Sequence, residues 1–278
     1  MSDPAAPRRA RRVTAHLLPR TASGAVAVAA SGGAWTVPGA RVAFGQDPAD
    51  AARSAARLAP GTPLTPVDCR TEFATVPAPS GPVDLHVDRV YYAAAATGPA
   101  ERTLPVGEAL ALPARPSAAD LLPEPPPAPR PRLARVASYG IVTDPAGRVL
   151  LSLISPGFPG AGTWHLPGGG VDHGESVREA LAREVVEESG QQATVGELIT
   201  IHSHHRAGEI GPESDDTEIH AVWVVFHVHV AEPTPPRVTE IAGSTIDTAW
   251  FTRAELADLP LSATAQRGFA ALSGTASG

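Results

Sequence analysis

An internal repeat constrains this chain more than any other feature of its sequence. A 29-residue segment that begins at Ala34 aligns without gaps with one that begins at Thr163. A second pair follows in the same order, DLHVDRVYYAA from Asp84 and EIHAVWVVFHV from Glu218. Identical residues of the first pair are Trp35, Pro38, Gly39, Val42, Gly45, Ala51 and Gly61, which match Trp164, Pro167, Gly168, Val171, Gly174, Ala180 and Gly190. Two matches in one order predict two tandem copies of a single fold.

A proline-rich stretch separates the two copies. Residues 113–132 read PARPSAADLLPEPPPAPRPR, and proline removes amide donors and favours extended backbone, so a semi-rigid linker is predicted. The predicted domains are then residues 13–112 and 133–278, which suits a length of 278 residues. Residues 1–12 carry four arginines among Pro and Ala and predict a disordered, solvated tail, with a nucleic-acid-binding arm as the alternative.

Composition excludes several classes of protein. Hydrophobic residues make up 43% and charged residues 18%, so the chain as a whole can bury cores. The net charge of −7 argues against a protein that coats nucleic acid and against binding to anionic membranes. No apolar run approaches the roughly 20 residues of a membrane span. The only cysteine, Cys69, cannot form an internal disulfide, so a cytoplasmic location is expected.

The second copy mixes strands with helices. Residues 136–144 and 148–154 are rich in β-branched and aliphatic residues and flank a Pro-Ala-Gly turn, which predicts a hairpin. A Gly-rich turn, a helix, further strands and two short C-terminal helices follow. Because the elements do not alternate strictly as βαβ, an α+β fold is predicted, with an α/β/α sandwich built on a mixed sheet.

The helix after the Gly-rich turn carries carboxylates where a core is expected. Ser176 and Glu179 form a capping-box pair, and Gly190 is a typical C-terminal stop, so a helix is predicted over residues 177–189. The residues that share one stripe of this helix are Val177, Ala180, Leu181, Glu184, Glu187 and Glu188. The stripe is apolar in its first half and acidic in its second half.

Three carboxylates on a face that should dock on the sheet repel one another unless cations neutralise them. A solvated charged face is the ordinary alternative for glutamates on a helix. In the first copy the matching positions are Ala55, Leu58 and Ala59, which predicts the same shape without the acidic cluster. Oxygen ligands favour hard divalent cations, so Mg²⁺ is the expected cofactor.

The acidic helix and the turn before it share a fixed spacing of glycine, arginine and glutamate. The residues in this spacing are Gly169, Glu175, Arg183, Glu184, Val185, Glu187, Glu188 and Gly190. The pattern resembles the Nudix box, and the preceding run from Trp164 to Gly169 resembles the lead-in of the family. Gln191 departs from the pattern, because the family usually has an aliphatic residue there.

The resemblance implies a hydrolase that cleaves the pyrophosphate linkage of a nucleoside diphosphate derivative or a nucleoside triphosphate. It implies Glu184 and Glu188 as the main ligands of Mg²⁺ or Mn²⁺, with the Gly168 carbonyl completing the coordination. Glu187 is a further ligand or a water-activating base, and Arg183 orients a glutamate by a salt bridge. No signal of a particular substrate type is present.

Residues beyond the box are weaker candidates. Arg206 is a candidate for contact with substrate phosphate. The family varies in its distal general base, for which Glu240 is the first candidate. Other acidic candidates are Glu209, Glu213, Asp215, Asp216 and Glu218, with an acidic surface loop as the alternative. Histidines at 202, 204, 227 and 229 alternate along predicted strands, which favours packing or substrate contact over a zinc site.

Other functions on the same fold remain as alternatives. A nucleotide-binding sensor or regulator would bind without turnover, although binding alone does not require three clustered carboxylates. An isopentenyl-diphosphate isomerase would need a cysteine in the acidic copy, and Cys69 lies in the other one. The first copy is expected to be non-catalytic and to form an intramolecular pseudo-dimer with the second. The expected partner is a small nucleotide, with no membrane and no specific nucleic acid.

Overall fold

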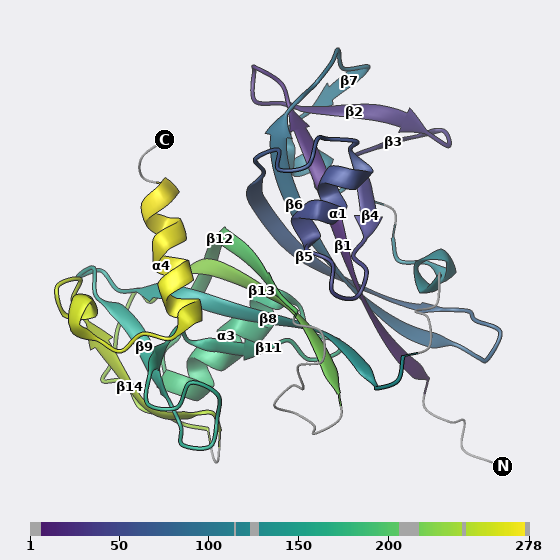
Figure 1. Ribbon diagram of the computed structural model, residues 1–278. Helices are drawn as coiled ribbons and strands as arrows, with labels where there is room; N and C mark the ends of the chain where they lie inside the picture. Colours follow the sequence, from purple (N-terminus) through teal and green to yellow (C-terminus); the bar gives the residue numbers. More distant parts are fainter. Residues whose placement is uncertain (1–6, 114, 123–127, 206–216, 241–242, 276–278) are drawn as a thin grey trace. The chain divides into compact units, whose positions relative to one another are not determined.

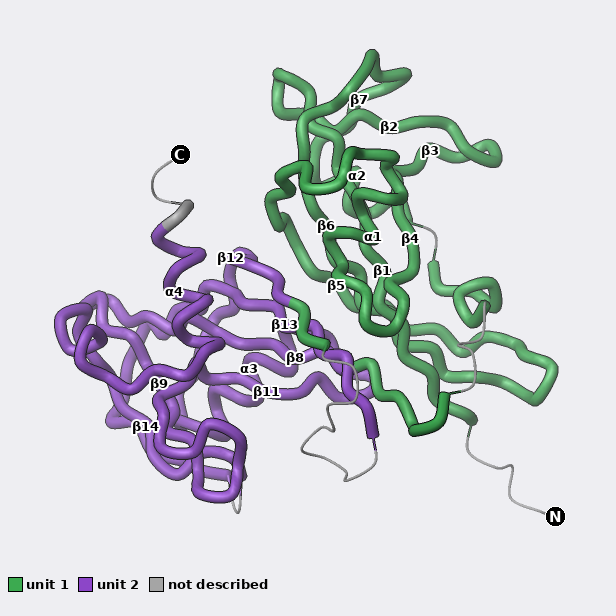
Figure 2. The backbone as a smooth tube through the Cα atoms, in the orientation of Figure 1, with its two compact units in different colours: residues 1–134, 203–207 green, residues 135–202, 208–278 purple. Residues whose placement is uncertain are grey.

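The computed structural model describes residues 7–113, 115–122, 128–205, 217–240 and 243–275. It divides into two compact units, residues 1–134 with 203–207 and residues 135–202 with 208–278 (Figure 2). Each unit contains one seven-stranded sheet and its own hydrophobic core. Among the described residues, no helix combines the length and the hydropathy that crossing a membrane requires.

The sheet of the first unit has the strand order β3-β2-β1-β6-β5, with β4 paired to β1 and β7 paired to β2 (Figure 1). It is mixed, because β1 runs parallel to β6 and antiparallel to β2 and β4. The strands are β1 (Arg8–Arg20), β2 (Val26–Ser31), β3 (Ala34–Thr36), β4 (Gly39–Arg41), β5 (Thr65–Val76), β6 (Val83–Ala95) and β7 (Arg102–Leu104). The helices of this unit are α1 (Pro48–Ala55), α2 (Val106–Ala109) and the 3-10 helix η1 (Ala118–Leu121).

The sheet of the second unit repeats this order strand for strand. It reads β10-β9-β8-β13-β12, with β11 paired to β8 and β14 paired to β9. The strands are β8 (Arg132–Thr143), β9 (Val149–Ile154), β10 (Trp164–His165), β11 (Gly168–Gly170), β12 (Thr194–His204), β13 (Glu218–His229) and β14 (Thr245–Phe251). The helices are α3 (Val177–Ser189), the 3-10 helix η2 (Glu255–Asp258) and α4 (Ala263–Thr275). The predicted duplication of one fold is confirmed.

Two helices cover opposite faces of the second sheet. A Cβ atom built on Gly140 of β8 would approach Leu181 of α3. The next residue of the strand, Ile141, belongs instead to a buried cluster with Ala265 of α4. Because consecutive strand residues point to opposite faces, α3 and α4 sandwich the sheet between them. The predicted α+β class and α/β/α layers are therefore confirmed for this unit.

The N-terminal arginines differ from the expected disordered tail. Strand β1 begins at Arg8, and its parallel ladder with β6 starts at the pair Arg8 and Val83. Arg11 Nε lies 3.2 Å from Oδ2 of Asp88, whose side chain is fully buried. The long neighbouring strand β6 offers backbone partners, and Asp88 offers a counter-charge, so residues 8–12 extend the sheet.

The expected linker is also partly folded. Ser117 caps helix η1 through a capping box with Asp120, and Leu121 is buried beside the core residues Val83 and Leu85. Arg12 donates hydrogen bonds to the carbonyl oxygens of Asp120 and Leu121, at 3.2 and 3.3 Å. The buried Leu121, the local cap and the hydrogen bonds from Arg12 therefore attach this part of residues 113–132 to the first unit.

Candidate active site

Helix α3 begins and ends where the sequence predicts. The N–H of Glu179 donates to Ser176 Oγ at 3.2 Å, and the Ser176 N–H donates to Glu179 Oε2 at 2.9 Å. Gly190 ends the helix in the left-handed region at φ 69°. Glycine adopts this conformation readily, because glycine has no Cβ atom. Both ends of the acidic helix are thus set by local sequence.

The acidic stripe of α3 passes from the core to the surface. Val177, Ala180 and Leu181 are buried, as expected for a docking face. Glu188 continues this face and is only 3% exposed, whereas the Glu187 side chain is 37% exposed. The predicted stripe therefore holds one carboxylate in the interior and others at its rim.

Glu188 is held in the interior by three hydrogen bonds. Its Oε2 accepts from Ser152 Oγ at 2.9 Å and from the Gly168 N–H at 3.1 Å, and its Oε1 accepts from Thr245 Oγ1 at 2.6 Å. Burial raises the pKa of Glu188 to about 7, against the lowering effect of these hydrogen bonds. Strands β9, β11 and β14 together fix the position of this carboxylate.

Arg183 joins the remaining carboxylates. Its Nε donates to Glu175 Oε1 at 2.9 Å. One terminal nitrogen donates to Glu184 Oε1 at 3.0 Å and to Glu187 Oε2 at 2.9 Å, while the other reaches the Gly170 carbonyl oxygen at 3.3 Å. These hydrogen bonds raise the pKa of Arg183 above its ordinary value. The guanidinium was expected to orient one glutamate, and the structure pairs it with three.

Glycines let strand β11 pass between α3 and β8. Gly168 has φ 135°, and a Cβ atom there would lie 2.2 Å from the Ser138 carbonyl oxygen. A Cβ atom on Gly169 would lie 2.6 Å from Glu184 Oε1. Any larger residue would displace backbone or the carboxylate, so the glycine run brings the backbone of β11 directly against Glu184 and Glu188.

Glu240 lies beside this cluster, although it is distant in sequence. Its backbone N–H donates to the Glu187 carbonyl oxygen at 3.0 Å. Burial is the main cause that raises the pKa of Glu184, and the charges of Glu187 and Glu240 raise it further. Arg206, Glu209, Glu213, Asp215 and Asp216 lie outside the described residues. Glu218 begins strand β13.

The donor set fits a hard divalent cation. Within the residues that the structure describes, no three His, Cys, Asp or Glu side chains stand arranged around a metal position. Arg183 pairs with Glu184 and Glu187. An orphaned polar atom lies on the same face of the sheet: the buried Ser138 Oγ has no hydrogen-bond partner. Ser138 pairs in register with Gly169, which contacts Glu184. Carboxylate, carbonyl and hydroxyl oxygens are the ligands that Mg²⁺ prefers.

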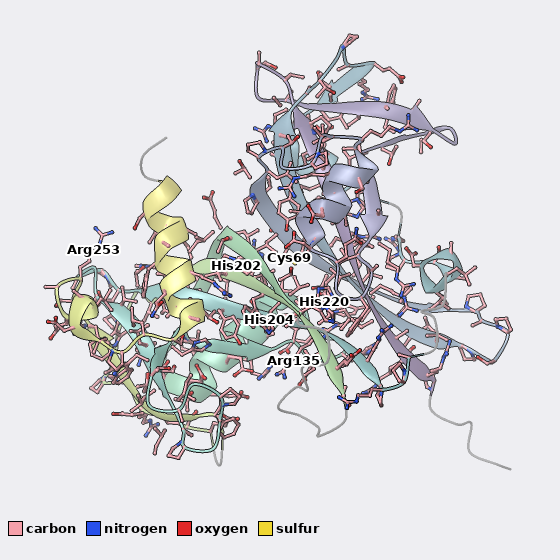
Figure 3. The ribbon with its side chains drawn as sticks, in the orientation of Figure 1. Cys69, Arg135, His202, His204, His220 and Arg253 are labelled. Atoms are coloured by element: carbon pink, nitrogen blue, oxygen red, sulfur yellow. The ribbon has the colours of Figure 1, made fainter. Side chains whose placement is uncertain are left out.

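The sequence did not reveal the residues that surround the helix. Ser152 and Thr245 hold Glu188 from strands 36 and 57 residues away, and no local motif marks them. Arg135 of β8 lies against Gly170, where a Cβ atom would be 2.6 Å from its guanidinium (Figure 3). Arg135 and Ser138 are three residues apart and lie on opposite faces of β8, and no repeating pattern in the sequence of this strand marks either one.

The described histidines of the second unit lie on strands, and one of them contacts the start of a helix. Figure 3 labels His202 and His204 on β12 and His220 on β13. His165 Nδ1 is 2.6 Å from Ser262 Oγ, and burial lowers the pKa of His165 to about 4. It is therefore neutral near pH 7 and belongs to the contact between β10 and the start of α4.

Comparisons with known proteins identify a family for the second unit. The family model of the NUDIX domain matches residues 133–272. The CTP pyrophosphohydrolase of Escherichia coli (strain K12) is 42% identical over 64 residues, which are 23% of this chain and 47% of that protein. The oxidized purine nucleoside triphosphate hydrolase of Danio rerio is 41% identical over 77 residues, 28% of this chain and 43% of that protein. The chain thus spans about half the length of the curated relatives it matches.

Solved structures also match. The MutT protein from Methanosarcina mazei Go1 aligns at a TM-score of 0.43 and 22% identity, covering 55% of this chain and 100% of that one. The MutT NUDIX hydrolase from Burkholderia pseudomallei aligns at a TM-score of 0.36 and 28% identity, covering 49% of this chain and 95% of that one.

Proposed function

This chain belongs to the Nudix family, and from that premise we propose that its second unit is a hydrolase that uses a divalent cation to cleave the pyrophosphate linkage of a nucleotide. One observation carries the proposal: Glu184, Glu187 and Glu188 lie at one end of α3, beside the glycine strand β11. The guanidinium group of Arg183 pairs with Glu184 and Glu187. A purely structural helix has no need of this arrangement, since apolar residues would bury the same face at lower desolvation cost.

Glu184, Glu187, Glu188 and the Gly168 carbonyl are the proposed ligands of Mg²⁺, with Mn²⁺ as a substitute. A divalent cation held there polarises a phosphoryl oxygen and neutralises part of the phosphate charge. Arg183 keeps the carboxylates close together before the cation binds. It also ties the loop that contains Glu175 to the helix.

A general base must accept a proton from the attacking water, and an accessible carboxylate can do this. Glu187 and Glu240 are both at the exposed side of the cluster, and each is a proposed general base. Arg206 is the proposed contact for substrate phosphate. Arg135, which lies at the edge of β11, is a second candidate for the same role.

The names of two relatives support a proposal for the substrate class. The two proteins named above are called a CTP pyrophosphohydrolase and an oxidized purine nucleoside triphosphate hydrolase. We therefore favour a nucleoside triphosphate over a nucleoside diphosphate derivative as the substrate. Hydrolysis between the α- and β-phosphates would release a nucleoside monophosphate and pyrophosphate.

The first unit is proposed to be non-catalytic, because Ala55, Leu58 and Ala59 stand at the positions of the three glutamates. We further propose that it pairs with the second unit as a pseudo-dimer. Expression of residues 133–278 alone tests the pairing: the fragment should self-associate, aggregate or lose several kcal/mol of stability. A monomeric fragment with unchanged melting temperature and full turnover would refute it.

A substrate screen tests the catalytic proposal. The full chain is incubated with nucleoside triphosphates and nucleoside diphosphate derivatives in Mg²⁺ or Mn²⁺, and products are separated by ion-exchange chromatography. We expect cleavage of at least one triphosphate, abolished by EDTA. Inactivity over the whole panel, combined with tight binding of one member, would replace the hydrolase by a nucleotide sensor.

A further inference from the structure

A segment without helix or strand crosses the C-terminal end of α3. It comprises residues 233–240, between β13 and β14, and we call it the strap. Its backbone N–H groups donate to carbonyl oxygens of the helix: Arg237 to Ser189 at 3.1 Å, Thr239 to Glu187 at 2.8 Å and Glu240 to Glu187 at 3.0 Å. The last four carbonyl groups of a helix lack partners within the helix, so the strap satisfies groups that α3 itself leaves open.

Gln191 anchors the other end of the strap. It follows α3 and is only 1% exposed. Its Nε2 donates to the Thr234 carbonyl oxygen at 3.2 Å and to Thr234 Oγ1 at 3.0 Å, and the Thr234 N–H donates to Gln191 Oε1 at 3.0 Å. An apolar side chain would fill a buried position at lower desolvation cost. What the amide adds at this position is the attachment to Thr234.

Prolines make a single anchor effective over the length of the strap. Pro233, Pro235 and Pro236 surround Thr234. Because proline fixes its own φ angle and restricts the residue before it, this part of the chain has few conformations. Its path from Thr234 to Glu240 is therefore set by the anchor at one end and by the carbonyl groups of α3 at the other.

The strap ends at the acidic cluster. Gly243 leaves room for the Glu240 carboxylate, since a Cβ atom on this glycine would overlap Glu240 Oε2. Burial is the first cause of the raised pKa of Glu184, and the charge of Glu240 adds to it, so the two carboxylates lie within electrostatic range. The backbone of Glu240 is fixed to Glu187. A carboxylate from outside the helix is thus held beside the cluster.

The first unit closes the same fold without a strap. Strand β7 pairs with β2 as β14 pairs with β9, so the connections before β7 and β14 are equivalent. These connections are residues 96–101 and residues 230–244. Thr62 stands at the position of Gln191, and its Oγ1 donates locally to the Ala59 carbonyl oxygen at 2.8 Å. The copy without the acidic cluster therefore also lacks the strap and its anchor, so the sheet requires neither.

We propose that Gln191 is a positioning residue, which fixes the strap through Thr234 and thereby holds the Glu240 carboxylate where it accepts the proton of the attacking water. The inference rests on the proposed function, in which Glu187 and Glu240 are both candidates for the base, and it selects Glu240. Glu187 is already engaged, because its Oε2 accepts a hydrogen bond from Arg183 at 2.9 Å. The strap places Glu240 by its backbone and leaves its carboxylate for the reaction.

Steady-state kinetics of the full chain test this role, with the triphosphate that the wild type cleaves. Gln191→Leu is similar in size but removes the amide. It should lower kcat about ten- to hundredfold and leave KM unchanged, because a displaced base weakens the transition state and not substrate binding. Gln192→Leu makes the same change at the next residue, which is exposed, and should keep the wild-type kcat.

A double-mutant cycle separates positioning from general stability. Glu240→Gln alone should lower kcat at least as much as Gln191→Leu, because the base itself is lost. In the Glu240→Gln background, Gln191→Leu should lower kcat no further, since it acts only through Glu240. A merely structural residue would lower kcat by the same factor in both backgrounds.

Thr234→Val guards against misfolding of Gln191→Leu. Thr234 is exposed, so this change removes the Oγ1 acceptor without disturbing the core. It should lower kcat about three- to tenfold, the effect of one lost hydrogen bond. Thr234→Ser keeps the hydroxyl group and should restore the wild-type kcat.

Hydrogen exchange with mass spectrometry tests the anchor independently of turnover. In Gln191→Leu, the peptide that contains Arg237, Thr239 and Glu240 should exchange at least about tenfold faster than in the wild type, because local opening becomes easier. In Gln192→Leu the same peptide should exchange at the wild-type rate.

Two results would overturn the inference and leave the proposed function intact. One is unchanged exchange of the strap in Gln191→Leu. The other is an active wild type in which Glu240→Gln keeps full kcat, or in which Gln191→Leu lowers kcat equally in both backgrounds. A wild type that cleaves no nucleotide would instead refute the proposed function, and the catalytic role of Gln191 would fail with it.

Discussion

Helices α1 and α3 occupy the same place in two copies of one fold, yet they end differently. Both begin at aligned caps, Asp47 and Ser176, whose side chains accept a backbone N–H of the first turn. Helix α3 continues for 13 residues to Ser189. Helix α1 stops after 8 residues at Ala55, so Leu58 and Ala59 lie beyond its end. The fold requires only the first two turns of this helix. Glu184 aligns with Ala55 at the end of α1, whereas Glu187 and Glu188 occupy the part that the first copy lacks.

The end of α1 has a local cause. The Leu58 N–H bonds to the Arg53 carbonyl oxygen, and Arg57 takes the left-handed conformation at φ 55°. These features terminate the helix before Gly61, which aligns with the stop residue Gly190. The aligned positions predict the same shape in the first copy without the acidic cluster, but the structure ends the helix instead. Loss of the glutamates that match Glu187 and Glu188 is therefore accompanied by loss of the helical turn that would present them.

Removing single charges from α3 should have the largest effect. Glu187→Gln or Glu188→Gln is nearly isosteric and should lower turnover by about two to four orders of magnitude, because a ligand or a base is lost. Circular dichroism should show an intact fold. Glu197→Gln, at an exposed position of β12, is the control and should keep full turnover. Activity that follows only the folded fraction of each variant would mean that these glutamates are structural.

Divalent cations should distinguish the two helices in the intact chain. Mg²⁺ at about 100 times its dissociation constant should add up to about 2.7 kcal/mol of protection to the helix that binds it. Hydrogen exchange with mass spectrometry should show this protection in peptides from α3 and β11. Peptides from α1 and β4 serve as the internal control. Equal protection of both copies would contradict the assignment of the first copy as a vacated site.

Removal of the helix caps should have the smallest effect of these changes, and the loss of stability should be similar in the two copies. Asp47→Ala and Ser176→Ala each remove one acceptor from the first turn of a helix, and each should lower the free energy of unfolding by about 0.5 to 2 kcal/mol. Urea denaturation of the full chain measures both losses. A loss of turnover by more than about tenfold in Ser176→Ala, without unfolding, would show that the cap also positions the catalytic cluster.

The sequence predicts best what is encoded locally. The capping box at Ser176, the stop at Gly190 and the duplicated order of strands follow from short patterns, and the structure confirms them. The bonds from Ser152 and Thr245 to Glu188 depend on tertiary packing across 36 and 57 residues, which no periodicity encodes. Arg8 and its neighbours look like a solvated tail for the same reason, because their partner strand begins 75 residues later.

That long parallel ladder has a consequence for how the chain folds. Strand β1 can pair with β2 and β4 early, whereas its long ladder with β6 must close a larger loop and therefore forms more slowly. Strand β13 holds the matching place in the second sheet, so it would be an alternative partner for β1 once it is synthesised. The Arg11–Asp88 ion pair favours the correct partner, because β13 carries Val222 at the position aligned with Asp88 and mispairing would bury the arginine against an aliphatic side chain. This ion pair would therefore disfavour an exchange of strands between the two related sheets during folding.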